Sequence, residues 1–319
     1  MHEFELIKNY FQKLSKKSPS ALNLNDDVFF DKKNKLVVSV DTYTQGVHFI
    51  DFKKPELVIK KIIRSSISDL ICKGVKPKYY FISASGNKKS FSKLNLSKIS
   101  KALNQEQNKY KISLSGGDTV FSNTLSFTIT SIGFANNIIY RNNAKINDDI
   151  YVSGNLGDSY LGLLVLKNKL KINHNLKKYF INHYFMPNIQ LRLTNQIKKI
   201  ANTSIDISDG LLVDLDKMIN NQKLSYKLFL KDIPISSNLK KILDSKKLSK
   251  INYVSNGDDY QILFTASKNK MRIIKKIALN CRVKLTKIGS IQSYGIKPSI
   301  VNDKNVQITL KNKGYSHKF

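Results

Sequence analysis

The residues of this chain best suited to chemistry are aspartates that sit beside glycines where short apolar segments end. Four such patterns occur: LSGGDT at 114–119, VSGNLGDS at 152–159, IDISDGLL at 205–212 and SNGDDY at 255–260. Glycine lets backbone N–H groups approach a phosphate closely, and a neighbouring carboxylate can hold a divalent cation. The four patterns together predict a nucleotide site that also binds metal ions.

The acidic residues are scarce, which makes their grouping informative. Of 23 acidic residues only four are glutamates, and many of the aspartates lie in tight groups. One glycine–aspartate turn alone is a common self-bonded turn, so the prediction rests on the recurrence of the pattern. We interpret the pair Asp148 and Asp149 as a turn, and Asp214 and Asp216 as solvated residues.

Several standard nucleotide motifs are missing. The sequence has no G-x-x-x-x-G-K-[ST] loop, no G-x-G-x-x-G after the first expected strand, and no protein-kinase catalytic loop with D-F-G. A nucleotide enzyme with this sequence must therefore have another architecture.

The net charge of +31 suggests nucleic-acid binding, but the residues that produce it argue against that function. Only five of the 54 basic residues are arginines, the type best suited to bidentate phosphate recognition. The lysines are spread along the whole chain. We therefore interpret the lysines first as a solvated basic surface and second as a means of attracting small anionic molecules. A non-catalytic protein that binds RNA or DNA is the less favoured alternative.

The remaining composition fits a cytoplasmic protein. Cys72 and Cys281 are too few for a disulfide framework or a zinc site. The N-terminal residues mix charges and lack the apolar region of a signal peptide. The longest apolar run, near 160–166, is too short to cross a bilayer.

Apolar periodicity predicts the elements that position the first acidic groups. Helical spacing covers 4–14, and β-branched runs predict strands at 28–30 and 36–40, with a further candidate at 47–49. A helix should begin at Pro55 and end before Gly74. Further strands are expected at 78–84, 111–114 and 125–134, and a helix is expected at 92–108.

The second half alternates strands and helices more regularly, which favours α/β layers. Strands are expected at 149–153, 204–207, 226–230, 260–265 and 283–288, and helices at 159–169, 189–201 and 209–220. The polar, turn-rich residues 136–147 separate the halves. We predict an N-terminal domain of residues 1–141 and a C-terminal domain of residues 142–319.

The motifs, taken in order, resemble the thiamine-monophosphate kinase family. They are DDVFF, SVDTYTQGVHF, SISDLICKGVKP, LSGGDT, YRNNAKINDD, VSGNLGDS, IDISDGLLVDL, NGDDYQILFT and KGY, and they span nearly the whole chain. The resemblance implies an α/β (α+β) fold of the two-domain, aminoimidazole-ribonucleotide-synthetase-like type. The N-terminal sheets would pair in a homodimer, and the C-terminal domain would be α/β. The implied reaction transfers the γ-phosphoryl group of ATP to thiamine monophosphate, giving thiamine diphosphate.

The resemblance also implies roles for particular residues. Several Mg²⁺ ions would be bound by Asp27, Ser39, Asp41, Asp69, Asp118, Asp206 and Asp209. ATP would contact Gly117, Asp118, Arg141 and Ser208, and thiamine monophosphate would contact His48, Asp258 and Tyr315. A need for K⁺ is left open. No catalytic acid or base is expected, because the acceptor phosphate is already an anion at pH 7.

The sequence departs from the family pattern at three positions. Asn25 replaces the usual glycine before the first acidic pair, Val40 replaces a threonine before Asp41, and Asp258 replaces a glutamate.

Another ATP-dependent enzyme of the same superfamily is the alternative function. A selenophosphate synthetase would need a reactive cysteine or selenocysteine near the N-terminus, where neither cysteine lies.

Overall fold

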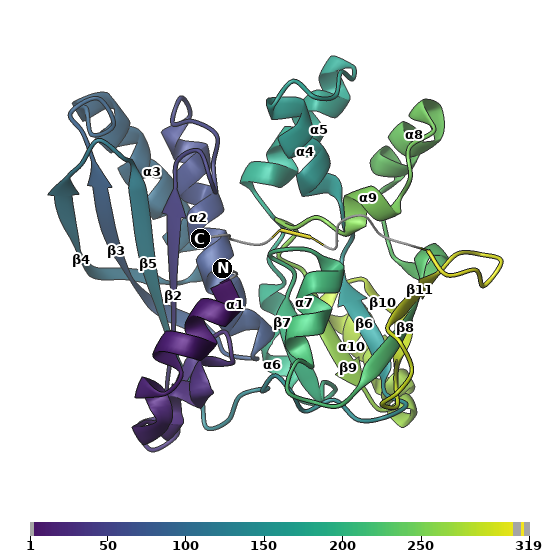
Figure 1. The fold of residues 1–319 in the computed structure, drawn as a ribbon. Helices are drawn as coiled ribbons and strands as arrows, with labels where there is room; N and C mark the ends of the chain where they lie inside the picture. The colour runs from purple at the N-terminus through teal and green to yellow at the C-terminus, as the bar shows by residue number, and fades with distance from the viewer. Residues whose placement is uncertain (1–2, 309–313, 316–319) are drawn as a thin grey trace.

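The computed structural model describes residues 3–308 and 314–315 and contains two β-sheets that lie side by side, each with helices packed on it (Figure 1). This mixed α/β architecture confirms the predicted fold class. The two sheets are built from residues before 135 and after 148, while the division between residues 141 and 142 stays a prediction. None of the described helices combines the length and the apolar character that a bilayer span requires.

The first sheet has five strands in the order β1-β2-β5-β3-β4. Their bounds are Phe29–Asp31 for β1, Leu36–Thr44 for β2, Pro77–Gly86 for β3, Ser113–Phe121 for β4 and Ser126–Phe134 for β5. All neighbours are antiparallel except β3 and β4, which are parallel. Strand β4 forms one edge of this sheet, and every residue in it is exposed.

The second sheet has six strands in the order β11-β8-β10-β6-β9-β7, antiparallel except for β11 and β8. Its strands are β6 Asp149–Ser153, β7 Thr203–Asp206, β8 Ser225–Phe229, β9 Ile262–Ala266, β10 Leu285–Gln292 and β11 Ser299–Val301. The α-helices of the described chain are α1 Glu3–Leu6, α2 Pro55–Cys72, α3 Lys93–Tyr110, α4 Asp158–Leu166, α5 His174–Phe185, α6 Thr194–Ile197, α7 Leu211–Met218, α8 Ser237–Lys246, α9 Ile251–Val254 and α10 Met271–Cys281.

Helix α2 lies between the two sheets and contacts both halves (Figure 1). Pro55 occupies its first turn, where a missing N–H costs nothing, and Gly74 follows its end with a φ of 73°. One side of α2 packs on β2 and β5, and it also contacts α5, α6 and β7 of the second half. A single apolar core therefore runs from Tyr43 in β2 to Phe264 in β9.

The N-terminal segment differs from the expected amphipathic helix. Helix α1 gives way to a π-helical turn at Ile7–Phe11 and a 3₁₀ turn at Leu14–Lys17. Phe11 and Leu14, expected on its buried side, are exposed. Apolar periodicity alone does not show whether the rest of the chain provides a surface on which these side chains can be buried.

Other differences concern where strands and helices end. Residues 47–49 form a turn closed by a bridge between Gln45 and Phe49 instead of a third strand. Strand β2 continues to Thr44 and β4 continues to Phe121, so Asp41 and Asp118 lie within strands and not at their ends. In the second half, the helix expected at 189–201 is reduced to a 3₁₀ turn and the four-residue helix α6.

Because α2 joins both halves, we expect loss of its core contacts to destabilise the protein. Ile62 on α2 is fully buried in the shared core. Ile62→Ala should lower the free energy of unfolding by about 2–5 kcal/mol in urea denaturation. Leu279→Ala, on the exposed face of α10, should change it by less than about 0.5 kcal/mol. Equal effects of the two substitutions would contradict this account of α2.

Candidate active site

A cleft lies where the two halves meet, and most of the predicted site residues line it. These are Asp27, Asp41, His48, Asp69, Arg141, Asp206, Ser208, Asp209, Asp258 and Tyr315. Ser39 lies beside the cleft, where its hydroxyl donates to Asp69 at 2.5 Å. Gly117 and Asp118 lie elsewhere, on β4. The structure therefore gathers residues from both sheets into one acidic site.

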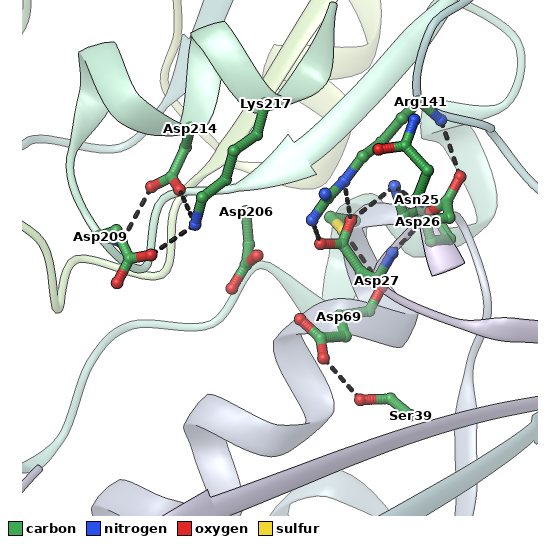
Figure 2. A network of polar contacts seen from close by, with 12 residues as sticks. Asn25, Asp26, Asp27, Ser39, Asp69, Arg141, Asp206, Asp209, Asp214 and Lys217 are labelled. Atoms are coloured by element: carbon green, nitrogen blue, oxygen red, sulfur yellow. Dashed lines mark hydrogen bonds and ion pairs between the residues drawn. The ribbon is translucent and has the colours of Figure 1, made fainter. Parts of the chain in front are cut away.

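Three carboxylates form the centre of this site. Asp27 precedes β1, Asp69 is in the last turn of α2, and Asp206 ends β7 (Figure 2). One oxygen from each lies within 4.8 Å of the others. In phosphoryl-transfer sites Mg²⁺ is held by carboxylate oxygens together with substrate phosphates and waters, so this set of oxygen donors fits Mg²⁺.

Hydroxyl groups orient two of these carboxylates. Ser39 on β2 donates to Asp69, and Ser68 donates to the Oδ2 atom of Asp206 at 2.5 Å. Ser68 directly precedes Asp69 in α2, so this one helix turn contacts the carboxylates of both halves. No local pattern in the sequence indicates a role for Ser68, because its partner lies 138 residues away.

The crowding of carboxylates changes their acidity. Burial raises the pKa of Asp41 to about 7 and that of Asp206 to about 6. Burial also raises the pKa of Asp69 well above its ordinary value, and the charges of Asp41 and Asp206 add to that effect. Burial and mutual repulsion therefore disfavour full ionisation of these acids, and positive charge supplied to the site favours it.

Part of that positive charge is built into the chain. The Lys73 ammonium is fully buried and lies 2.8 Å from Oδ1 of Asp26 and 2.7 Å from Oδ2 of Asp27. Arg141 also pairs with Asp27 through its guanidinium, and its backbone N–H donates to Asp26 at 2.9 Å (Figure 2). Sequence reasoning missed Lys73, although it stands just past the end of α2, a position that favours cations.

Asp209 lies apart from the central carboxylates in this structure. Its side chain pairs with Lys217 of α7, which also lies 3.3 Å from Asp214 (Figure 2). Asp214 was expected to be solvated, but it is fully buried and accepts backbone N–H bonds from Asp209 and Gly210, both at 2.9 Å. The expectation was wrong because Asp214 faces back onto the turn at the start of its own helix.

The turn at 257–260 is built for close packing against residues 208–210. A Cβ on Gly257 would lie 1.8 Å from the Ser208 carbonyl oxygen, so only glycine fits there. Asp258 follows with a φ of 68°, and its side chain reaches the cleft. Asp259 turns away from the cleft and accepts from the backbone N–H of Gly157 at 2.8 Å.

The pattern at 152–159 therefore has a structural role. Gly157 precedes helix α4, and Asp259 satisfies its N–H group. Asp158 is buried and accepts from Ser236 at 2.7 Å and from Tyr179 at 3.0 Å. Only two of the four glycine–aspartate patterns, at 205–212 and 255–260, border the cleft.

Asp118 is too far from Asp41 to share a metal ion with it in the same chain. Asp41 pairs across the sheet with Ile129, Ile129 with Ile82, and Ile82 with Gly117, the residue before Asp118. Three strand spacings of about 4.8 Å separate the backbones of the two residues by about 14 Å. The glycine–aspartate pattern of β4 lies instead on an exposed edge (Figure 1).

The departures at Asn25 and Val40 have local consequences. Asn25 exchanges two side-chain hydrogen bonds with Asn220, at 3.0 and 2.8 Å, and so links the first acidic segment to the second half. Val40 lines the cleft with an apolar side chain, which cannot act as a metal ligand.

Comparisons with known proteins agree with this geometry. The family model "AIR synthase related protein, N-terminal domain" matches residues 24–135. The chain is 35% identical to the thiamine-monophosphate kinase of Buchnera aphidicola subsp. Acyrthosiphon pisum, over 99% of this chain and 98% of that protein. It is 31% identical to that of Haemophilus influenzae, with the same coverage. The solved structure of AaThiL complexed with AMPPCP and TMP is similar over 99% of this chain and 97% of its own, with a TM-score of 0.85 and 25% identity.

The raised pKa of Asp206 predicts how stability depends on pH without metal. The folded protein keeps this proton up to about pH 6, whereas the unfolded chain releases it near pH 3.8. The wild type should therefore lose stability relative to Asp206→Asn as pH rises from 3 to 7, by about 3 kcal/mol. Urea unfolding in EDTA at a series of pH values measures this, and parallel profiles for the two proteins would contradict the burial effect.

Proposed function

The chain belongs to the thiamine-monophosphate kinase family, and we propose that it transfers the γ-phosphoryl group of ATP to thiamine monophosphate, giving ADP and thiamine diphosphate. The observation that carries this proposal is the full-length match to these enzymes, together with a cleft whose carboxylates meet at the junction of the two halves. The similar AaThiL structure holds AMPPCP and TMP, an ATP analogue and a thiamine phosphate.

Asp27, Asp69 and Asp206 would hold Mg²⁺, with Asp41 beside them. When bound, Mg²⁺ neutralises phosphate charge and orients the phosphoryl group for in-line transfer. The acceptor phosphate is already ionised near neutral pH, so the residues of the cleft need not remove a proton from it. The task of this chain is therefore to position two anionic substrates in an acidic cleft.

Arg141 and Ser208 support the proposed ATP end of the cleft. Arg141 reaches Asp27 with its guanidinium, so a phosphate at this place would meet a group that can bind two oxygens at once. Ser208 borders the same cleft. A hydrogen bond holds its backbone, because its carbonyl oxygen accepts from the N–H of Asp258 at 2.8 Å. Arg141 thus pairs with Asp27 when no nucleotide is bound, and it would contact a phosphate when ATP is bound.

His48, Asp258 and Tyr315 support the proposed thiamine end. The Nδ1 atom of His48 accepts from the backbone N–H of Thr44 at 3.0 Å, which sets the imidazole against the ring of Tyr43. Tyr315 is held by its backbone N–H, which donates to the carbonyl of Asp209 at 3.0 Å. These side chains offer aromatic and acidic groups to a cationic, aromatic substrate.

We further propose that the active form is a homodimer in which the partner subunit's Asp118 completes the site. The exposed edge of β4 supports this, because a long unpaired strand invites pairing with another copy. The distance of about 14 Å between Asp41 and Asp118 within one sheet also supports it. Gly117 directly precedes Asp118, so it would border the same shared site. Only glycine fits at this position, because a Cβ would lie 1.8 Å from the carbonyl oxygen of Ile82.

We propose a cytoplasmic location for this activity. Both cysteines, Cys72 and Cys281, are free and buried, as is usual in a reducing compartment. Nucleic acid has no part in the proposed reaction, since the described acidic cleft would repel it.

Subunit mixing tests both the reaction and the shared site. Asp41→Asn and Asp118→Asn should each reduce turnover of thiamine monophosphate at least about 100-fold, because each removes charge that stabilises the transition state. If the two residues act in one site from different chains, a mixed dimer keeps one intact site. Equal mixing, with subunit exchange, should therefore restore about a quarter of the wild-type activity.

The matched control mixes Asp41→Asn with Asp69→Asn. These residues come from one chain, so every mixed dimer carries a defect in both sites and no activity should return. A monomer by light scattering, or no recovery in the first mixture, would contradict the shared site. Wild-type protein that does not phosphorylate thiamine monophosphate would contradict the proposed reaction.

A further inference from the structure

A buried ammonium group lies behind the proposed thiamine end of the cleft. Lys61, in the middle of α2, is only 1% exposed. Its Nζ atom lies 2.6 Å from Oδ1 of Asp258 and 3.6 Å from the centre of the Tyr184 ring. A lysine so deeply buried is costly unless its charge is paired, and here a carboxylate and an aromatic face supply the compensation.

Lys61 links parts of the chain that are far apart in sequence. It belongs to the first half, whereas Asp258 and Tyr184 belong to the second. The Tyr184 hydroxyl in turn donates to the carbonyl oxygen of His48 at 3.1 Å. The contacts of Lys61 and Tyr184 therefore connect His48 to Asp258, two of the three residues proposed to contact thiamine monophosphate.

The same contacts define how the Asp258 carboxylate is presented. Its Oδ1 atom accepts both from Lys61 and from the Tyr260 hydroxyl, the latter at 3.1 Å. Among the described residues these contacts use one oxygen, which leaves Oδ2 for a donor in the cleft. Asp258 and Tyr260 both have positive φ, 68° and 49°, a backbone conformation that is uncommon for residues other than glycine. The contact of 2.6 Å between Lys61 and Asp258 connects this turn to α2.

We propose that Lys61 is a positioning residue for thiamine monophosphate, acting through Asp258: its ammonium fixes Oδ1 so that Oδ2 can accept from the substrate's amino group. This proposal rests on the proposed function. Thiamine carries an amino group on its pyrimidine ring and a positive charge on its thiazolium ring, and a carboxylate suits both. Among the described residues, the Lys61 ammonium pairs with Asp258 and Tyr184 and with neither Arg141 nor Ser208, the side chains proposed for ATP, so its loss should affect thiamine monophosphate more than ATP.

Steady-state kinetics of Lys61→Met, which keeps the apolar stem and removes the charge, tests the proposal. KM for thiamine monophosphate should rise about tenfold to a hundredfold, the loss expected for a hydrogen bond between charged groups, while KM for ATP changes less than about twofold. Arg64→Met is the matched control. Arg64 lies one turn along α2, is buried, and pairs with Glu106, away from the cleft. Its loss should lower stability and leave the KM for thiamine monophosphate unchanged.

A double-variant comparison shows whether Lys61 acts through Asp258. In an Asp258→Asn background, Lys61→Met should change KM for thiamine monophosphate by less than about threefold, because the contact is already weakened. In the double variant both partners of the ion pair are neutral, so no buried charge is left unpaired. This variant therefore still tests the proposal if Lys61→Met alone does not fold.

An unchanged KM for thiamine monophosphate in Lys61→Met would overturn the proposal, as would equal rises for both substrates or a tenfold further rise in the double variant. Wild-type turnover in the same assay separates these outcomes from failure of the proposed function itself.

Discussion

Mutual repulsion among buried carboxylates is the constraint on which this structure depends. Asp27, Asp69 and Asp206 bring oxygens within 4.8 Å of one another at the junction of two sheets. In a partly dehydrated site such charges repel strongly. Lys73 and Arg141 offset the charge of Asp26 and Asp27, while Asp69 and Asp206 are left with raised pKa values. The site is thus arranged to gain stability when divalent cations bind.

Helix α2 makes this arrangement possible. Its apolar face packs in the core shared by both halves, so the helix is fixed by contacts that have no part in the chemistry. From that rigid position it places Lys61 against Asp258, Ser68 against Asp206, and Asp69 within the cluster of three carboxylates. Lys73 lies just past its end, beside the first acidic pair. A site built on a packed helix is held more precisely than one built on loops alone. The net charge of +31 would also favour the approach of anionic substrates to the protein.

Most of the sheet strands and the acidic groups could be predicted from the sequence, because both depend on local signals. Apolar runs indicated β2, β5 and α2, and aspartates beside glycines indicated the residues at 206 and 258. Long-range pairing could not be predicted in the same way. The burial of Asp214, the capping role of Asp259, and the ion pairs of Lys61 and Lys73 depend on which segments meet in space. The location of Asp118 was also unpredictable, since strand order decides that it lies at an edge.

We infer that this cleft binds divalent cations through carboxylates that both halves contribute. Calorimetric titration of the metal-free protein with Mg²⁺ at pH 8, without nucleotide, measures this binding, and urea unfolding at each Mg²⁺ concentration measures its effect on stability. We expect saturable binding, with a gain of about 2.7 kcal/mol in unfolding free energy at 100 times the dissociation constant. Asp69→Asn should lose most of both effects. Equal binding by wild type and Asp69→Asn, or no binding by either, would contradict it.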